Sequence, residues 1–417
     1  MRLKELTNEE FNQFVNSYPI KSLYQTPEYA FVMNEQNYDS IFLGLIDDED
    51  HVVAASLILI EKLHGFKYAY APRGFLIDYQ NQTLLKTYTE EIKRYLGKRD
   101  IVAIKIAPHI VKEIHDINHN ITTPNQYYPI IFRNLTETGY YHLGYNNNFE
   151  ALKPRYEAIL DLDVPYYLLF KNFQKSFRTK IRSAVRKGVQ IYKGKQEELD
   201  YLYLHTQKKY PRDLKYFQDC FHFFGKKNNV DFFYAKLNTH TFLLESQKQY
   251  EYYEQKSNQI NDRIIRNSGR NSLRLINQKI GIDNQYEQAK KDLVLATNLL
   301  RDYPEGIVLA STLMIKNQNE VYMIMDGYDP KYKSFNAKHL LLWKVIEKYS
   351  KQGFQKFNFG GVTNPNLKDN KYQGLNQFKL SFNSKIYEYA GDFELVTNTA
   401  LYFMYRNAAP LRSILKK

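Results

Sequence analysis

Cysteine is almost absent from this chain: Cys220 is the single one in 417 residues. One thiol excludes an internal disulfide and a metal cluster built on several thiolates. Because Cys220 lies in an aromatic stretch, we expect it to be a packed core residue. The sequence predicts neither a metal site nor a bound cofactor.

Long hydrophobic runs are also missing. The N-terminus is polar and has no signal-peptide core, and no uninterrupted apolar run approaches the length of a membrane span. We therefore expect the protein to stay in the cytoplasm.

The rest of the composition is that of a folded protein, with 43% hydrophobic and 25% charged residues. The length favours two domains over one core. The formal net charge of +13 indicates an anionic partner: nucleic acid, an anionic lipid surface or a phosphorylated substrate. A lysine-rich composition inherited from an AT-rich genome is the alternative.

Two stretches of the chain show the same order of strand, strand, strand, helix and strand. The first covers 40–46, 51–60, 67–71, 81–96 and 101–107, and the second covers 231–236, 306–315, 320–327, 337–349 and 356–359. This order indicates a duplicated unit that resembles the GNAT acyltransferase core. We predict an α/β (α+β) fold of two GNAT-like lobes in one globular unit. The boundaries are 1–165, completed by 385–417, for the first lobe, and 166–240 with 301–384 for the second.

The two copies differ in their first hairpin. A short acidic turn at 47–50 in the first copy corresponds to a long insert in the second. Its apolar residues step by three and four along two segments, which predicts an antiparallel coiled-coil arm over 241–300 with a turn at 267–271. The arm is either a spacer or a site for tRNA or a partner protein.

A strongly basic segment runs from Lys171 to Lys195 and contains no acidic residue. Five of its cations share one predicted helix face, opposite an apolar face: Lys171, Lys175, Arg178, Arg182 and Arg186. Neighbouring like charges repel, and a phosphate backbone would offset that cost. We expect contact with nucleic acid or polyphosphate rather than a solvated face. No motif of a sequence-reading DNA-binding module is present, so shape-based RNA binding fits better.

Several short segments occur in the order of one known family. They are Ala71-Pro72-Arg73-Gly74 with Asp78-Tyr79, Lys153-Pro154-Arg155, the basic segment, Phe359-Gly360-Gly361-Val362, and Tyr372-Gln373-Gly374 with Phe378-Lys379. With the arm between them, the chain resembles the Fem family of aminoacyl-tRNA-dependent peptidyltransferases that build peptidoglycan bridges. Its layout is closest to the MurM/MurN-like members.

The resemblance implies a chemistry. An amine of the stem peptide, on lipid II or on UDP-MurNAc-pentapeptide, attacks the ester of aminoacyl-tRNA through a tetrahedral oxyanion. Such a reaction needs positioning and oxyanion stabilisation more than a protein nucleophile, and no nucleophile elbow is present. The resemblance places Lys379 at the reaction centre, with Phe378 beside it. In that role Lys379 either stabilises negative charge or acts as a base. Without the resemblance, Lys379 would be interpreted as a surface charge and Phe378 as a core residue.

The same resemblance implies that Arg212 and Tyr216, at the start of a helix, bind the phosphorylated sugar; a capped surface helix is the alternative. One family lysine is missing, because Met33 stands where it is expected, four residues after Tyr29. Tyr29 or Arg73 would then take over the contact with the precursor that the missing lysine makes in the family.

Two other functions remain open, an acyl-CoA-dependent GNAT enzyme and a non-catalytic RNA-binding protein. The first lacks the glycine-rich loop that usually holds pyrophosphate. The C-terminal stretch after Glu394 is basic and partly apolar, so it either rests on an anionic membrane surface or packs as a terminal helix. The amino acid transferred, its position in the bridge and the oligomeric state are left open.

Overall fold

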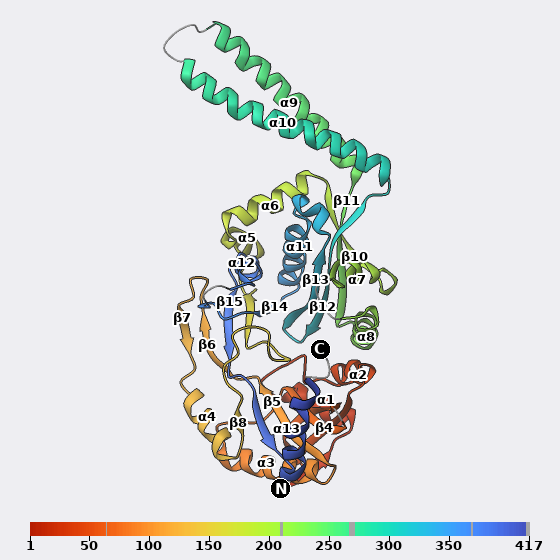
Figure 1. The fold of residues 1–417 in the computed structure, drawn as a ribbon, viewed down its shortest axis with the longest axis vertical. Coiled ribbons are helices and arrows are strands. Elements are labelled where there is room, and N and C mark those ends of the chain that lie inside the picture. The colour runs from red at the N-terminus through yellow and green to blue at the C-terminus, as the bar shows by residue number, and fades with distance from the viewer. Residues whose placement is uncertain (64, 209–211, 267–271, 368–369, 414–417) are drawn as a thin grey trace.

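The computed structural model describes residues 1–63, 65–208, 212–266, 272–367 and 370–413. These residues form two β-sheets with surrounding helices, stacked along the long axis, and a helical arm that projects from one end (Figure 1). The predicted α/β fold with two lobes and an inserted arm is confirmed.

The first sheet lies at the end of the molecule away from the arm (Figure 1). In the described part of the chain its strand order is β1 (Arg2–Glu5), β2 (Asp39–Ile46), β3 (Val52–Leu63), β4 (Phe66–Arg73), β5 (Ile101–Pro108), β16 (Phe393–Val396) and β8 (Tyr141–His142). The helices of this lobe are α1 (Asn8–Ser17), α2 (Pro27–Glu35), α3 (Gln82–Gly97), α4 (Tyr128–Glu137) and α13 (Thr399–Ser413).

The second sheet lies between the first lobe and the arm. Its described strands run in the order β10 (Val189–Gly194), β11 (Val230–Leu237), β12 (Ile307–Asn317), β13 (Glu320–Tyr328), β14 (Lys356–Val362), β9 (Tyr156–Asp161), β15 (Lys385–Tyr389), β6 (Val111–His115) and β7 (Ile121–Pro124). Its helices are α5 (Tyr166–Asn172), α6 (Lys175–Arg186), α7 (Asp200–Thr206), α8 (Leu214–Gly225), α11 (Ala337–Lys351) and α12 (Gln373–Leu380), with 3₁₀ turns η1 (Gln196–Glu198) and η2 (Pro330–Phe335).

The strand pairing supports the predicted duplication. In the first lobe β2, β3 and β4 are antiparallel neighbours, α3 follows, and β5 pairs parallel to β4. In the second, β11, β12 and β13 are antiparallel, α11 follows, and β14 pairs parallel to β13. The arm joins β11 to β12, so it occupies the place of the short turn between β2 and β3.

The lobe boundaries differ from the predicted ones. β6, β7 and β9 precede residue 165, and β15 follows residue 384, yet all four belong to the second sheet. The reason is backbone pairing: β9 lies between β14 and β15, and β15 carries β6. The chain therefore crosses between the lobes more often than a linear division predicts.

Each lobe buries its own apolar core, and a further core cluster spans the two. Helix α3 illustrates how helical spacing builds the core of the first lobe. Asn81 caps its first turn by accepting a hydrogen bond from the Leu84 N–H. Leu85, Tyr88, Ile92 and Leu96 then recur at helical spacing and are buried against the first sheet. Between the lobes α2 packs against α8.

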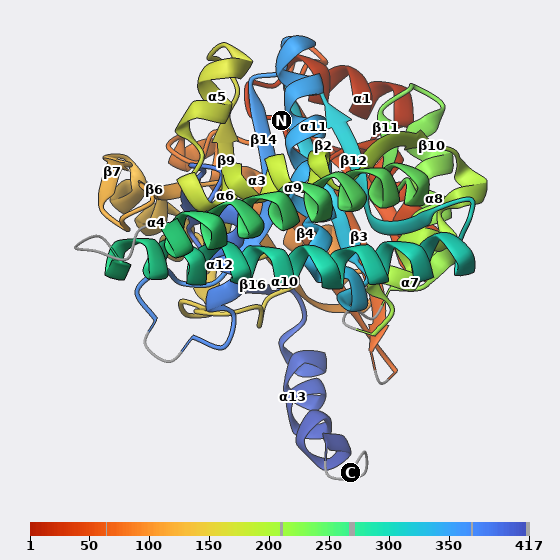
Figure 2. The same cartoon turned by 90° about the horizontal axis from the view of Figure 1, so that it is seen from above.

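The arm consists of α9 (Thr239–Arg266) and α10 (Ser272–Asp302), which pack along their length. Seen from above, they lie across the body, and α13 projects away from it (Figure 2). The seam mixes buried Ile260 and Ala289 with polar pairs such as Ser257–Asp283, 2.7 Å apart. The predicted turn at 267–271 lies outside the described residues.

None of the helices in the described ranges is both long enough and apolar enough to cross a membrane.

Candidate active site

The strands β13 and β14 separate soon after they meet. They pair over Glu320–Tyr322 and Lys356–Asn358 and not beyond, whereas β4 and β5 of the first lobe stay paired to their ends. At Gly360 the backbone of β14 adopts a positive φ of 73°, inside a register shift against β9. In the second lobe the two strands therefore diverge where those of the first lobe do not, and we call this divergence the opening of the second sheet.

Lys379 lies at this opening, in the last turn of α12. It is 6% exposed, and its Nζ donates a hydrogen bond of 2.7 Å to the Gly361 carbonyl. Burial lowers the pKa of Lys379 to about 8; Asp326 on β13 opposes the shift and Lys338 adds to it. A buried ammonium with a shifted pKa, beside separated strands, is a candidate reaction centre.

The groups around Lys379 are an ion pair and a set of aromatic rings. Lys338 at the start of α11 pairs with Asp326, and its Nζ lies 4.2 Å from the centre of the Phe378 ring. Phe378 is half-buried and also contacts His339, with ring centres 5.3 Å apart. Burial and then Lys180 lower the pKa of His339 to about 3, so its imidazole is neutral at pH 7. Phe378 is thus partly a core residue, which was the alternative interpretation of its position in the sequence. It lies at the edge of the opening.

The predicted basic helix is divided into α5 and α6. The break falls at Phe173, whose ring is buried, and the next N–H, from Gln174, donates to the Ser381 carbonyl at 3.1 Å. The prediction of one continuous helix is therefore wrong: Lys171 lies on α5, and Lys175, Arg178, Arg182 and Arg186 lie on α6.

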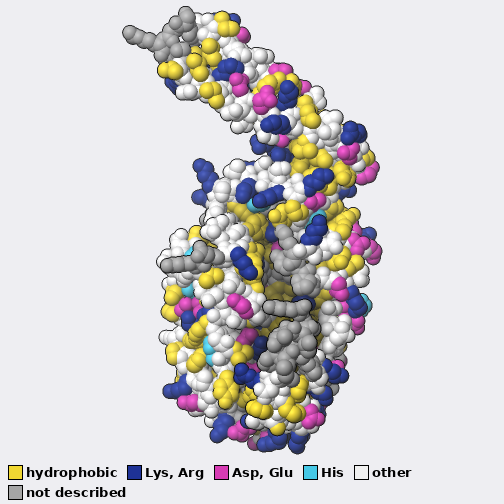
Figure 3. All heavy atoms as spheres, in the orientation of Figure 1, with side chains coloured by type: hydrophobic (Ala, Val, Ile, Leu, Met, Phe, Trp, Pro, Cys, Tyr) yellow, Lys and Arg dark blue, Asp and Glu magenta, His cyan; other side chains and the backbone are white. Residues whose placement is uncertain are grey.

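Helix α6 contacts the candidate reaction centre with its apolar face, which lies opposite the basic face. Phe177 of α6 packs on Phe378, with ring centres 5.7 Å apart. None of the five predicted cations forms an ion pair with a described residue, and the buried Nε of Arg178 has no hydrogen-bond partner there. Figure 3 shows Lys and Arg side chains over the α6 end of the body, near the base of the arm. The face carries positive charge that the described protein leaves unpaired.

Arg212 and Tyr216 come together at the start of α8. Asp213 caps this helix by accepting from the Tyr216 N–H at 2.9 Å. The cap sets Arg212 just before the first turn, with its guanidinium 4.5 Å from the centre of the Tyr216 ring. Tyr216 is buried and Arg212 is exposed.

Tyr29 faces this pair from the other lobe. Thr26 caps α2 by accepting from the Tyr29 N–H, and Pro27 begins the helix. The Tyr29 ring is buried, and its hydroxyl accepts a hydrogen bond of 3.1 Å from Lys153. Met33 is packed into the core between the lobes, so it presents no polar group here.

Lys153 is a residue that the site prediction missed. Its Nζ lies 3.3 Å from the centre of the Tyr24 ring, beside Tyr29. The sequence did single out the Lys153-Pro154-Arg155 segment, but only as part of the family resemblance, and it assigned no chemical role to Lys153.

Arg73 is occupied elsewhere. Its guanidinium donates to Glu157 and to the Pro154 carbonyl, both at 2.7 Å, and lies 3.7 Å from the centre of the Tyr389 ring. At 3% exposure it has no surface to offer a substrate. The structure therefore uses Arg73 as a tie between the lobes rather than as a group that compensates for Met33.

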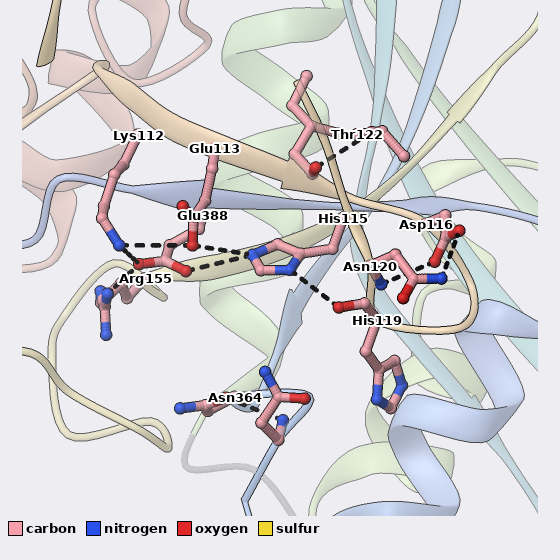
Figure 4. A network of polar contacts seen from close by, with 12 residues as sticks. Lys112, Glu113, His115, Asp116, His119, Asn120, Thr122, Arg155, Asn364 and Glu388 are labelled. Carbon is pink, nitrogen blue, oxygen red and sulfur yellow. Dashed lines mark hydrogen bonds and ion pairs between the residues drawn. The ribbon is translucent and has the colours of Figure 1, made fainter. Parts of the chain in front are cut away.

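A polar network at β6 and β15 has ligand types that a metal accepts (Figure 4). Single ligand atoms of Glu113, His115 and Glu388 lie within 4.8 Å of one another. Arg155 and Lys112 already pair with Glu388, and Lys112 also reaches Glu113. Two cations thus balance the two carboxylates, and we assign the network to joining the strands.

Known proteins resemble this chain along nearly its whole length. The model of the FemAB family matches residues 6–409. Aminoacyltransferase FemB of Staphylococcus epidermidis is 27% identical over 100% of both chains. Lipid II:glycine glycyltransferase of Staphylococcus haemolyticus is 23% identical over 98% of this chain and 96% of its own. The crystal structure of FemX superposes with a TM-score of 0.73 at 20% identity, covering 97% of this chain and 99% of that one.

The fold, the site and these relatives define an aminoacyltransferase. The chain belongs to the FemAB family, which confirms the predicted family. The closer likeness to its MurM/MurN-like members stays a prediction.

Proposed function

We propose that the protein transfers an amino acid from aminoacyl-tRNA to the stem-peptide amine of a peptidoglycan precursor and so builds the interpeptide bridge. The proposal draws on family membership and on a relative named for glycyl transfer to lipid II. The observation that carries it is the placement of Lys379, a buried ammonium at the opening between β13 and β14.

In this proposal Lys379 stabilises the oxyanion. With a pKa of about 8 it is largely protonated at pH 7, and a cation in a dry site stabilises developing negative charge more strongly than in water. Phe378 and its aromatic neighbours keep water away from the opening. The acceptor amine itself is the nucleophile, so the protein supplies position and charge.

The basic face of α6, with Lys171 on α5, contacts the tRNA backbone. In support, Phe177 on the apolar face of α6 packs on Phe378 beside Lys379, so a tRNA bound to the opposite, basic face would lie one helix away from the opening. Arg212 and Tyr216 face the phosphorylated part of the precursor, lipid II or its nucleotide form, with Tyr29 across from them.

Transfer is tested by mixing the purified protein, lipid II or UDP-MurNAc-pentapeptide, and each charged tRNA in turn, and weighing the stem peptide by mass spectrometry. We expect one charged tRNA to make the stem heavier by one amino-acid residue. No product with any charged tRNA would contradict the proposal.

We also propose that the protein acts in the cytoplasm and touches the membrane through α13, where Phe403 is 70% and Met404 50% exposed beside Arg406. Residues 414–417, part of the predicted basic end, lie outside the described residues. Flotation with anionic liposomes is the test, and removal of residues 399–417 should abolish it. Equal flotation of the shortened chain would contradict membrane contact.

A further inference from the structure

Lys153 lies among aromatic side chains, and no described residue gives its ammonium a counter-ion. Its Nζ donates to the Tyr29 hydroxyl at 3.1 Å and lies 3.3 Å and 5.0 Å from the centres of the Tyr24 and Tyr29 rings. Among the described residues, no carboxylate oxygen lies within 4.0 Å of it. Lys153 is half-buried, and taking a charge even partly out of water without a partner is unfavourable, so such a residue indicates a missing anion.

A second cation faces the same place. Arg212 lies against Tyr216 and acts on the ionisation of Lys153 and of Tyr24, Tyr29 and Tyr38. Burial, Arg73 and Arg212 lower the pKa of Lys153 well below its usual range, and Glu157 and Cys220 oppose the shift only in part. Two like charges held together repel, and an anion between them would turn that repulsion into attraction.

We propose that Lys153 and Arg212 form one anion site where α2, α8 and the segment before β9 meet, and that Lys153 binds the diphosphate of the acceptor. This diphosphate joins the acceptor's sugar to a nucleotide or to a lipid, so both acceptor forms share it. The inference rests on the proposed function. An ammonium, a guanidinium and tyrosine hydroxyls are all donors, and a diphosphate offers only acceptor oxygens at neutral pH.

The site also explains the missing family lysine. The charge expected at Met33 on α2 is absent because Met33 is packed in the core. Lys153 brings a charge to the same face of α2 from a different part of the chain, through its contacts with Tyr24 and Tyr29.

A close packing contact and a hydrogen bond connect this site to the reaction centre. Pro154, next to Lys153, packs on Gly361 so closely that a Cβ there would lie 2.8 Å from the proline ring. The carbonyl of Gly361 accepts the hydrogen bond from Lys379. A diphosphate on Lys153 therefore fixes one end of the acceptor at a set distance from the opening where its amine reacts. We assign Lys153 a positioning role.

The kinetic test uses the full chain with Lys153→Met, which keeps the length of the side chain, and Lys153→Arg, which keeps the charge. We expect the methionine variant to raise the KM for the acceptor about tenfold or more. Its kcat and its KM for aminoacyl-tRNA should stay near the wild-type values, and the arginine variant should recover most of the loss. Lys86→Met on α3, an exposed lysine of the first lobe, is the matched control.

A binding test needs no transfer and so separates this inference from the proposed function. Inorganic diphosphate is titrated into each variant by calorimetry, in buffers of different ionisation heat. We expect wild type to take up a proton on binding at high pH, Lys153→Arg to bind without uptake, and Lys153→Met to bind weakly. Unchanged binding by the methionine variant would overturn the proposal, as would a general loss of thermal stability that arginine does not restore.

The two acceptor sources are distinguished by comparing UDP-MurNAc-pentapeptide with lipid II in detergent. Equal losses in Lys153→Met identify the shared diphosphate as the ligand. A loss with one acceptor alone assigns the site to that acceptor, and no loss with either overturns the proposal.

Discussion

Gly361 and Pro154 touch so closely that a side chain at position 361 would force one of them to shift: an added Cβ would lie 2.8 Å from the ring of Pro154. This contact joins β14, whose carbonyl holds Lys379, to the segment that carries Lys153 and Arg155. The reaction centre and the diphosphate site that we propose are therefore coupled through this packing contact.

Gly361→Ala tests this coupling. The added methyl group must push the proline segment or β14 away, which costs about 1–3 kcal/mol of folding free energy. We expect a rise in the acceptor KM together with a fall in kcat, because both ends of the acceptor shift. Gly374→Ala is the control, since a Cβ at Gly374 meets no atom within 4 Å. Wild-type kinetics in Gly361→Ala would show that the packing does not set the geometry of the site.

The ion pair of Arg73 and Glu157 should stabilise the fold rather than bind substrate. Both side chains are 4% exposed and their atoms lie 2.7 Å apart. Arg73→Met leaves the Glu157 carboxylate buried without its cation, and we expect a loss of about 3–5 kcal/mol in the free energy of unfolding, measured in urea. Asp50→Asn, which breaks the exposed pair with Arg2, should change it little. A folded Arg73→Met of normal stability whose defect is confined to acceptor binding would contradict the structural role.

The charge state of Lys379 determines how the rate depends on pH. With a folded pKa of about 8, the ammonium is lost as pH rises through that value. A charge-stabilising Lys379 therefore predicts that kcat falls above pH 8, whereas a base would make it rise. The quantity to measure is the ratio of wild-type kcat to that of Lys379→Arg at each pH, because titration of the acceptor amine cancels in it. A ratio that climbs through pH 8 would assign Lys379 as the base.

The cations of α6 should contribute to tRNA binding in proportion to the phosphates they neutralise. For Arg182→Gln we expect weaker binding of charged tRNA and a slope of log K against log salt that is smaller by about 0.7–0.9. Acceptor binding should not change. Lys86→Gln serves as the control for a cation in the other lobe, and equal effects of the two variants would remove α6 from the tRNA surface.

Much of the fold could be read from the sequence because its signals are local. The repeated order of strands and helices located α3 and α11, and the acidic turn at 47–50 marked the place that the arm occupies in the second lobe. The break before α6 was not visible, because it depends on Phe173 entering the core and on Gln174 bonding to Ser381. Such partners lie far away in the chain, so no local pattern reports them.

The site was predictable only where the family resemblance named residues. Lys379 was expected at the reaction centre, and nothing in its local sequence showed that it would be buried. Arg73 was expected to replace the lysine missing at Met33, and its pairing with Glu157 was not visible because that residue lies in a distant strand. Lys153 escaped because a lone lysine before a proline has no periodicity, and only the fold brings it to Tyr24 and Tyr29.

The central claim is amino-acid transfer that depends on Lys379. Its most direct measurement is the mass of the stem peptide after one incubation of the precursor and charged tRNA with wild type or with Lys379→Met. We predict a stem heavier by one amino-acid residue with wild type, and a rate about 10²–10³ lower with the variant. An unchanged stem with every charged tRNA, or equal product from both proteins, would contradict the account.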